Sequence, residues 1–241
     1  MEKKRILAIT LARGGSKGVK NKNIKLLQGK PLIYYTIKEA LKAKYIDRYI
    51  ISTDSKKIMT IAKKFKAEAP FLRPKKLSSD KATSVDALKH AVRWAEKNEG
   101  HKYDIIIELM CTNPFKISED IDRIITKIKK TKADSVIAVH KIEDHHPARI
   151  KKIINGKIKN FCIKEKLESR RQDLRPLAYI RSGSIYALKR DYLFSKSQRY
   201  GSNNSRPYIL PESRVINIDN KTDFVTAEAM MKTKKYARKK I

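Results

Sequence analysis

The stretch from residue 11 to residue 23, LARGGSKGVKNKN, concentrates glycines and cations directly after a short apolar run. Glycines let the backbone turn tightly and direct several N–H groups toward an anion, and basic side chains add full positive charges around it. This combination suits a polyphosphate, whose oxygens accept hydrogen bonds from both backbone and side chains. The residues concerned are Arg13, Gly14, Gly15, Lys17, Gly18 and Lys22.

The same stretch lacks the signatures of the common phosphate-binding loops. Lys17 is followed by Gly18 instead of the Ser or Thr that holds magnesium in a Walker loop, and the stretch does not match G-x-G-x-x-G. The alternative interpretation is an ordinary glycine-rich turn with solvated lysines. The stretch alone does not choose between the two.

A polyphosphate site needs rigid elements behind it, and the apolar pattern of the chain supplies them. Continuous apolar runs are typical of strands buried on both faces, and between them apolar residues recur at helical spacing. This alternation predicts a Rossmann-like, doubly wound, mainly parallel α/β sheet. In such a sheet ligands bind beyond the carboxyl ends of strands, where the glycine-rich stretch lies.

Local signals set the expected elements. We expect strands over 5–11, 48–53, 104–109, 135–139, 183–188 and 215–219. Helices are expected over 30–43, after a cap at Ser55, from Thr83 or Ser84, after a cap at Ser118, and over 226–240. In the first of these helices the buried face should carry Ile33, Ile37, Ala40 and Leu41.

The strand–helix rhythm breaks after Val139. Short strand-like runs surround a turn at 155–156, and a charged loop, KLESRRQDLRP, follows. Because long irregular segments inside a domain are usually functional or interfacial, we divide the chain into an α/β domain (1–139 and 181–241) and an inserted dimerisation arm (140–180). A second copy of the chain should cover apolar side chains that so thin an arm cannot bury. They are Ile150, Ile153, Ile154, Ile158 and Phe161.

The chain has 241 residues, 41% of them hydrophobic, which is enough for one substantial core. Its formal net charge of +32 would also fit a nucleic-acid-binding protein, and this is the alternative from a different functional class. The charge is mostly lysine, 41 Lys against 16 Arg, and it is spread along the chain without a helix-turn-helix signature or an aromatic-rich platform. Biased composition is therefore the preferred explanation of the charge.

Cysteine use and hydropathy bear on location. Cys111 and Cys162 lie far apart and outside any metal-ligand spacing. The sequence contains no apolar run of membrane-spanning length and no recognisable signal peptide. We expect a reduced, cytoplasmic protein without a membrane partner.

Further stretches follow the glycine-rich one in a characteristic order: LRPKKLSSDKATS, HHP, RRQD, YIRSGSIYAL and INIDNKTDF. From residue 6 to about 229 the sequence resembles the acylneuraminate cytidylyltransferase family, the CMP-sialic acid synthetases and related nonulosonic acid cytidylyltransferases. The resemblance implies a nucleotide-diphospho-sugar transferase type of fold. It also implies Mg²⁺-dependent transfer of CMP from CTP to the anomeric hydroxyl of a nonulosonic acid, with release of pyrophosphate. Sialic or legionaminic acid is the first expectation, and pseudaminic acid, Kdo or a sugar phosphate are alternatives.

The resemblance also implies roles for individual residues. The catalytic cations around the triphosphate would be Arg13, Lys17 and Lys22. The nucleotide-binding residues would be Leu11, Ala12, Arg13, Gly14, Gly15, Ser16, Lys22, Asn23, Arg73 and Ser84. The sugar-binding residues would be Met110, Thr112, Arg171, Gln172, Ser182 and Gly183, with Arg171 or Gln172 reaching the neighbouring subunit of a homodimer. Asp219 would hold Mg²⁺ together with Asn217.

Three positions depart from the family pattern. Asn217 stands where an aspartate is usual, which removes a charge beside the metal. Met110 replaces the glutamine of an LQPTSP stretch, and Ser182 replaces the asparagine of IRNG. The nucleotide half therefore matches better than the sugar half. His145 and His146 do not form a metal pair, because neighbours on an extended segment point to opposite faces, so a structural or substrate-edge role is expected.

Overall fold

The computed structural model describes residues 4–16, 18–142, 144–166 and 168–233, and a six-stranded sheet forms the centre of this part of the chain. Its strands are β1 (Ile6–Leu11), β4 (Arg48–Ser52), β5 (Ile105–Leu109), β6 (Ser135–Ile142), β9 (Ala178–Lys189) and β10 (Ser205–Ile209). Their order is β10-β6-β9-β5-β1-β4, and neighbours run parallel except for β9, which is antiparallel to β5 and β6. The expected doubly wound, mainly parallel sheet is confirmed.

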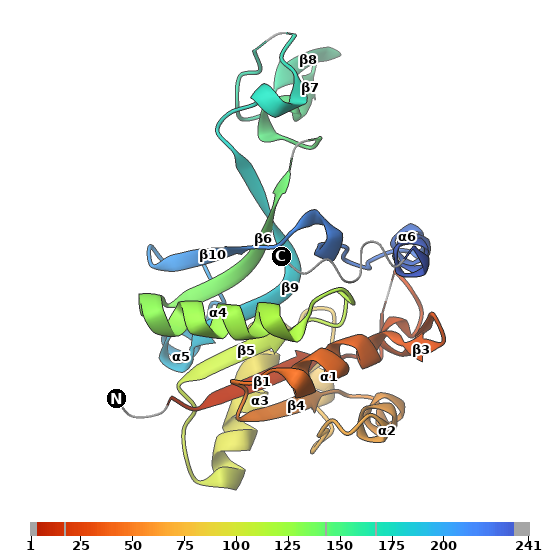
Figure 1. Cartoon of the computed structure of the whole chain (residues 1–241), viewed down its shortest axis with the longest axis vertical. Coiled ribbons are helices and arrows are strands. Elements are labelled where there is room, and N and C mark those ends of the chain that lie inside the picture. The colour runs from red at the N-terminus through yellow and green to blue at the C-terminus, as the bar shows by residue number, and fades with distance from the viewer. Residues whose placement is uncertain (1–3, 17, 143, 167, 234–241) are drawn as a thin grey trace.

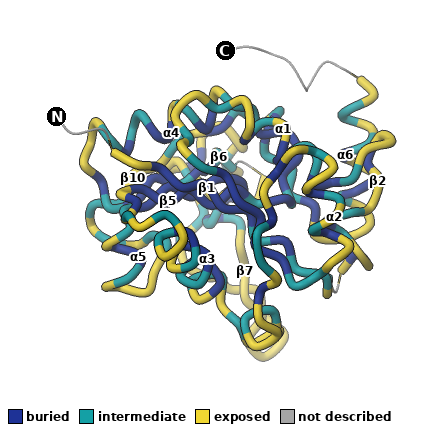
Figure 2. The backbone as a smooth tube through the Cα atoms, turned by 90° about the horizontal axis from the view of Figure 1, so that it is seen from below, coloured by how far each residue is buried: buried dark blue, intermediate teal, exposed yellow. Residues whose placement is uncertain are grey.

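Helices cover both faces of this sheet. α1 (Leu32–Lys42), α2 (Lys56–Lys64) and α4 (Ser118–Thr131) pack on one face, and α3 (Ser84–Glu99) and α5 (Arg190–Lys196) pack on the other. Successive side chains of β1 serve the two layers alternately, because a strand presents alternate residues to opposite faces. Figure 2 shows the strands as the buried centre of the molecule, between helices with exposed outer surfaces.

The start signals of the helices are mostly as expected. The Ser55 side chain accepts a hydrogen bond from the N–H of Ile58 at 3.4 Å, and the Thr83 side chain caps α3 by accepting one from Asp86 N–H at 3.1 Å. The expectation for Ser118 is wrong by one residue, since α4 begins at Ser118 and the capping position is Ile117.

Other expectations fail where contacts distant in sequence decide the structure. Residues 215–219 form no strand, and β10 was not expected. The closing helix, α6, spans Lys221–Lys232, so it begins earlier than expected, and residues 234–240 lie outside the described part of the chain. Leu41 is 50% exposed, because α1 turns its buried face to the sheet through Ile33, Ile37 and Ala40.

A small satellite core lies beside the main sheet. Strands β2 (Leu26–Leu27) and β3 (Lys30–Pro31) form a short antiparallel pair, and α6 packs against this side through Phe224 and Ala227. Ile218 is buried in the same cluster, so the chain just before α6 is anchored there. Short 3-10 turns occupy η1 (Lys22–Ile24), η2 (Lys75–Leu77), η3 (Pro147–Arg149), η4 (Arg171–Asp173) and η5 (Glu212–Arg214).

The irregular segment stands away from the sheet. β6 and β9 continue beyond it as a two-stranded stalk, and the hairpin of β7 (Lys151–Ile154) and β8 (Lys157–Asn160) lies at its far end (Figure 1). The expected turn at Asn155-Gly156 is present, and both residues have positive φ. Ile153 and Ile158 are 78% and 73% exposed, so within one chain the segment does leave apolar side chains uncovered.

None of the helices in the described part of the chain has the length and apolar character of a membrane span.

Candidate functional site

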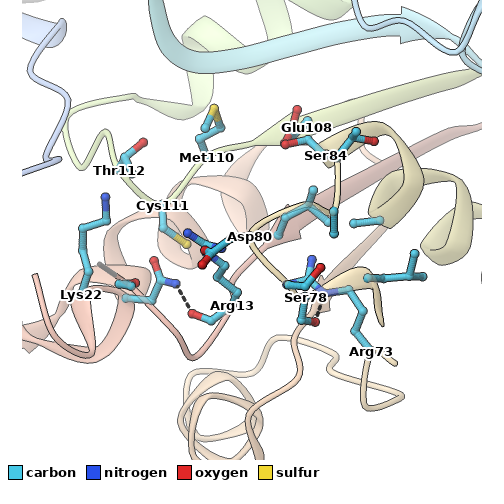
Figure 3. Close-up of a pocket in the computed structure, with 18 of the residues that line it drawn as sticks. Arg13, Lys22, Arg73, Ser78, Asp80, Ser84, Glu108, Met110, Cys111 and Thr112 are labelled. Carbon is cyan, nitrogen blue, oxygen red and sulfur yellow. Dashed lines mark hydrogen bonds and ion pairs between the residues drawn. The ribbon is translucent and has the colours of Figure 1, made fainter. Parts of the chain in front are cut away.

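A cavity of about 470 Å³ lies beyond the carboxyl ends of β1 and β5. β1 connects through α1 to β4 on one side, while β5 lies on its other side, and such a divergence of connections opens a crevice in α/β sheets. Figure 3 shows Lys22 at one end of the cavity, Arg73 and Ser78 at the other, and Arg13 with Asp80 between them. Many of the residues assigned from the sequence line this cavity. They are Leu11, Arg13, Ser16, Lys22, Asn23, Arg73, Ser84, Met110, Thr112 and Asp219.

The glycines of the loop serve different purposes. The glycine N–H groups of the loop were expected to point toward an anion. The N–H of Gly14 instead donates to Asp54 Oδ1 at 2.8 Å. Gly18 passes so close to the Asp219 carbonyl that an added Cβ would lie 2.2 Å from its oxygen. A side chain at residue 18 would therefore push the loop away from residue 219. Gly15 is exposed, and an added Cβ there would meet nothing within 4 Å.

The cations of the loop face carboxylates across the cavity. Arg13 pairs with Asp80 at 2.9 Å, and Lys22 donates from Nζ to Asp219 Oδ1 at 3.0 Å and to the Ile218 carbonyl at 2.8 Å. Both guanidinium and ammonium are thus held at the cavity wall, ready to exchange a carboxylate for a more highly charged anion. Lys17, the third expected cation, lies outside the described residues.

Asn23 and Ala12 shape the loop from behind. Asn23 is buried, and its Nδ2 donates to the Arg13 carbonyl at 3.0 Å, which fixes the backbone beneath the Arg13 side chain. Ala12 is fully buried in the main core and does not line the cavity.

At the other end of the cavity Arg73 is 5% exposed. Its Nε donates to Ser78 Oγ at 3.0 Å, and its backbone N–H donates to the Thr53 carbonyl at 2.7 Å. Burial lowers the pKa of Arg73, while the nearby Asp54 carboxylate opposes that shift. Ser84 opens α3 beside it, so the positive end of a 16-residue helix faces the same space.

Glu108 is a cavity residue that the sequence reasoning missed. It lies on β5 with 1% exposure, and Oε2 accepts a hydrogen bond from Arg199 Nη1 at 2.6 Å. Burial raises the pKa of Glu108, and the Arg199 charge opposes the rise. An acidic residue inside the apolar run DIIIEL was the available signal. Its partner, 91 residues away, could not be seen locally.

The turn after β5 carries Met110, Cys111 and Thr112 into the cavity. The Thr112 carbonyl accepts the N–H of Ile218 at 2.7 Å, which joins this turn to the segment before α6. Burial raises the pKa of the Cys111 thiol to about 12, so it is a neutral thiol near pH 7 and not a nucleophile.

Asp219 and Asn217 lie side by side on that segment. Asn217 donates from Nδ2 to Asp219 Oδ2, and its Oδ1 is buried without a partner among the described residues. In the described part of the chain no group of three or more His, Cys, Asp or Glu side chains could hold a metal by itself. One carboxylate that lines a cavity large enough for phosphate groups does fit Mg²⁺, which proteins commonly bind through one or two carboxylates together with substrate phosphates.

A second cavity, of about 630 Å³, lies beside the first along β9. It is lined by Ser182, Gly183 and Asn217, and also by Arg181 and Tyr186, which the sequence reasoning did not single out. The two cavities are linked where Thr112 Oγ1 donates to the Gly183 carbonyl at 3.5 Å and where Asn217 contacts Asp219. Four of the expected sugar-binding residues are therefore divided between two adjoining cavities, Met110 and Thr112 in the first and Ser182 and Gly183 in the second.

The remaining assigned residues lie on the arm. Arg171 pairs with Asp144 at 2.9 Å and Gln172 is exposed, and neither lines one of the two cavities described above. The two histidines of HHP do point apart as expected. His145 lines the second cavity, whereas His146 is 2% exposed and bridges Ala148 N–H and the Pro176 carbonyl.

The amino-acid sequence of this chain is similar to those of known proteins over most of its length. Residues 7–173 match the family model described as "Cytidylyltransferase". The chain is 31% identical over 233 residues to a pseudaminic acid cytidylyltransferase of Campylobacter jejuni, covering 94% of this chain and 96% of the relative. It is 30% identical over 234 residues to a CMP-N,N'-diacetyllegionaminic acid synthase of Campylobacter jejuni, covering 97% and 98%.

Among solved structures, a CMP:2-keto-3-deoxy-manno-octonic acid synthetase complexed with CTP resembles this chain with a TM-score of 0.70. The superposition covers 95% of this chain and 99% of the other, at 18% identity, so this likeness concerns the fold.

Proposed function

Because the chain belongs to the cytidylyltransferase family, we propose that it transfers the cytidylyl group of CTP to the anomeric hydroxyl of a nonulosonic acid and releases pyrophosphate. One observation carries the proposal. A single cavity at the carboxyl ends of β1 and β5 has the cation Lys22 at one end, Arg13 near its middle, and the buried Arg73 with Ser84 toward the other end. This arrangement is suited to a molecule with a polyphosphate at one end and a polar base at the other.

The triphosphate would lie against Arg13 and Lys22, displacing their contacts with Asp80 and Asp219. Negative charge grows on the leaving pyrophosphate as the bond to the α-phosphorus breaks. Fixed cations stabilise that growth more than they stabilise the ground state. Positioning of the acceptor hydroxyl in line with the leaving group would supply much of the remaining rate.

The cytidine would lie toward Arg73 and Ser84. The Arg73 guanidinium is held by Ser78 and by burial, so its remaining N–H groups are oriented before a ligand arrives. Donors with fixed directions suit the carbonyl oxygen and ring nitrogen of a pyrimidine.

Asp219 would hold Mg²⁺ together with phosphate oxygens of CTP, and the ion would neutralise phosphate charge during transfer. Lys22 donates to the same carboxylate and would exchange that contact for a phosphate oxygen when CTP binds. Asn217 would orient Asp219 through its amide N–H and leave the metal with one protein carboxylate.

The acceptor acid would occupy the second cavity. Arg181 supplies a full positive charge there, which suits the carboxylate shared by all nonulosonic acids. Met110, Thr112, Ser182 and Gly183 lie where the two cavities adjoin, so they would face the hydroxyl that attacks phosphorus.

The arm would complete the site of a second subunit. Its apolar side chains are exposed in the single chain, and the same apolar face of a twofold-related copy would bury them. In such a homodimer Arg171 or Gln172 would reach the partner's acceptor cavity. The free Cys111 and Cys162 and the use of CTP support a reducing, cytoplasmic setting.

Pyrophosphate release tests the reaction. The purified chain is incubated with CTP, Mg²⁺ and, separately, sialic, legionaminic or pseudaminic acid, Kdo or a sugar phosphate. We expect release with one nonulosonic acid well above the others, and little release when ATP, GTP or UTP replaces CTP. Release with a sugar phosphate but with none of the acids would show that the acceptor is a sugar phosphate and not a nonulosonic acid. Absence of release with every acceptor would overturn the proposal.

A further inference from the structure

Lys116 lies behind the catalytic cavity, between the turn after β5 and the start of α4. It is 1% exposed, although lysine rarely enters a core without partners. Its Nζ donates to Thr36 Oγ1 at 2.9 Å, to the Met110 carbonyl at 2.7 Å and to the Asn113 carbonyl. Three oxygen acceptors therefore meet the three N–H groups of one ammonium.

Two of these acceptors are the ends of the turn that enters the cavity. Met110 begins the turn and Asn113 closes it, so the ammonium joins the two ends from inside the protein. Asn113 adds to the closure, since its Oδ1 accepts the backbone N–H groups of Phe115 at 3.0 Å and Lys116 at 3.1 Å.

The same turn supports the segment that carries Asp219. Asn113 Nδ2 donates to the Arg214 carbonyl at 2.8 Å, and the Thr112 carbonyl accepts the N–H of Ile218 at 2.7 Å. A displacement of residues 110–113 would therefore move Thr112 in the cavity and the backbone next to Asp219 together.

We propose that Lys116 is a positioning residue for the transfer reaction, and that its ammonium holds the 110–113 turn so that the acceptor side and the Asp219 side of the site stay in register. This inference rests on the proposed function for its activity readouts. Misplacing reacting groups by a fraction of an ångström is enough to slow an enzyme without unfolding it.

The protonation state of Lys116 should matter for this role. Burial lowers the pKa of Lys116 to about 8, while the carboxylates of Glu39 on α1 and Asp120 on α4 oppose the shift, and Cys111 on the turn is a neutral thiol at this pH. A neutral amine has two N–H groups for three acceptors. Turnover should therefore fall as the pH rises through about 8, because one oxygen of the turn or of Thr36 loses its donor.

Three variants separate positioning from general stability. Lys116→Met removes the ammonium with similar volume, Lys116→Arg keeps a charge that does not titrate in this range, and Thr36→Val removes one acceptor. Lys127→Met is the matched control, because Lys127 lies on α4 and donates to the Pro207 carbonyl at 2.6 Å, away from the turn.

We expect Lys116→Met to lower kcat for pyrophosphate release at least tenfold and Lys116→Arg to recover part of that loss. The alkaline fall in kcat should move to higher pH in Lys116→Arg and to lower pH in Thr36→Val, because losing an acceptor disfavours the charged amine. Lys127→Met should follow the wild type. Unchanged kcat in a folded Lys116→Met, or alkaline limbs that coincide in all variants, would overturn the proposal.

Hydrogen exchange gives a readout that does not depend on activity. Peptides covering 109–113 and 214–219 should exchange faster in Lys116→Met, and those in α3 should not change. If the wild type shows no transfer with any acceptor, the proposed function fails, and this local exchange still decides whether Lys116 holds the turn. Should Lys116→Met not fold, exchange and pH profiles of Lys116→Arg and Thr36→Val decide, and wild-type behaviour in both would overturn the role.

Discussion

At the scale of single residues, the site is built from charges that already face opposite charges. Arg13 forms an ion pair with Asp80, and Lys22 forms one with Asp219, so the conformation of each cationic side chain is restricted before the substrate binds. The contacts are partly exposed, and pairs of this kind contribute little to stability. Their value lies in orientation of the cations toward the cavity, which predicts a large effect on catalysis and a small one on folding.

Arg13→Ala and Lys22→Ala should each slow cytidylyl transfer severely, by about 2–4 kcal/mol in the barrier, because each removes a charge-assisted contact to a phosphate that gains charge. Melting temperatures should remain near that of the wild type. Lys20→Ala is the control, since Lys20 is exposed in the same loop and does not line the cavity. Near-normal turnover in Arg13→Ala and Lys22→Ala would remove the phosphate-binding role of the loop.

Asp219→Ala should abolish most of the Mg²⁺-supported transfer, whereas Asn217→Ala should have the smaller effect, because an ionised carboxylate attracts Mg²⁺ far better than an amide does. Asn217→Asp should lower the Mg²⁺ concentration for half-maximal rate by adding a charge beside Asp219. Titration of Mg²⁺ against initial rate measures both. Asp191→Ala, a 92% exposed side chain on α5, is the control. Full activity in excess chelator would contradict the metal assignment.

At the scale of elements, the geometry of the site depends on close approach between segments that are distant in sequence. The glycine-rich loop after β1 touches the segment before α6 at Gly18 and Asp219, and the turn after β5 touches it at Thr112 and Ile218. Three connections therefore meet at one edge of the sheet. Each is short and is held by backbone contacts, so small side-chain additions at the contact should disturb it.

Gly18→Ala tests this contact, because its Cβ would lie 2.2 Å from the Asp219 carbonyl oxygen and one of the two segments must move. We expect more than a tenfold loss of kcat/KM with a nearly unchanged melting temperature, since Gly18 and Asp219 are not part of the main core. Gly15→Ala should lose much less, because its added Cβ meets nothing within 4 Å. Equal losses in the two variants would show that general stiffening of the loop, and not the contact with Asp219, is responsible.

At the scale of the whole molecule, the stalk and hairpin leave the α/β body and carry apolar side chains into solvent (Figure 1). Ile153 and Ile158 are direct partners in the β7–β8 pair, so they lie on one face of the hairpin. We interpret this face as part of a subunit contact. A homodimer would also explain why Arg171 and Gln172 line neither of the two cavities described above.

If the chain is the proposed homodimer, changing Ile153 and Ile158 to lysine together should convert it to a monomer, because two buried ammonium groups would face the partner without counter-charges. Light scattering at micromolar concentration measures the change, and transfer activity should fall with it. Lys152→Ala with Lys159→Ala, on the opposite face of the same hairpin, is the control. A wild-type chain that is monomeric and fully active would show that no partner completes the site.

The sequence alone predicted most of the elements and pointed to a polyphosphate at the first loop. Apolar periodicity and caps at Ser55 and Thr83 are local properties, so the order of most strands and helices could be predicted. The residues at 13 and 22 suggested a polyphosphate for the same reason. Local pattern failed at 215–219, where a run typical of a strand is held by Thr112 and the satellite core instead of a ladder.

Only the tertiary structure decided which of these residues meet. Lys22 and Asp219 are 197 positions apart, and Glu108 and Arg199 are 91 apart. It also divided the assigned residues between two adjoining cavities and gave Gly14 N–H to Asp54. The physical reason is that such contacts depend on how helices and strands pack, and packing sums many weak apolar contacts that no short stretch of sequence contains.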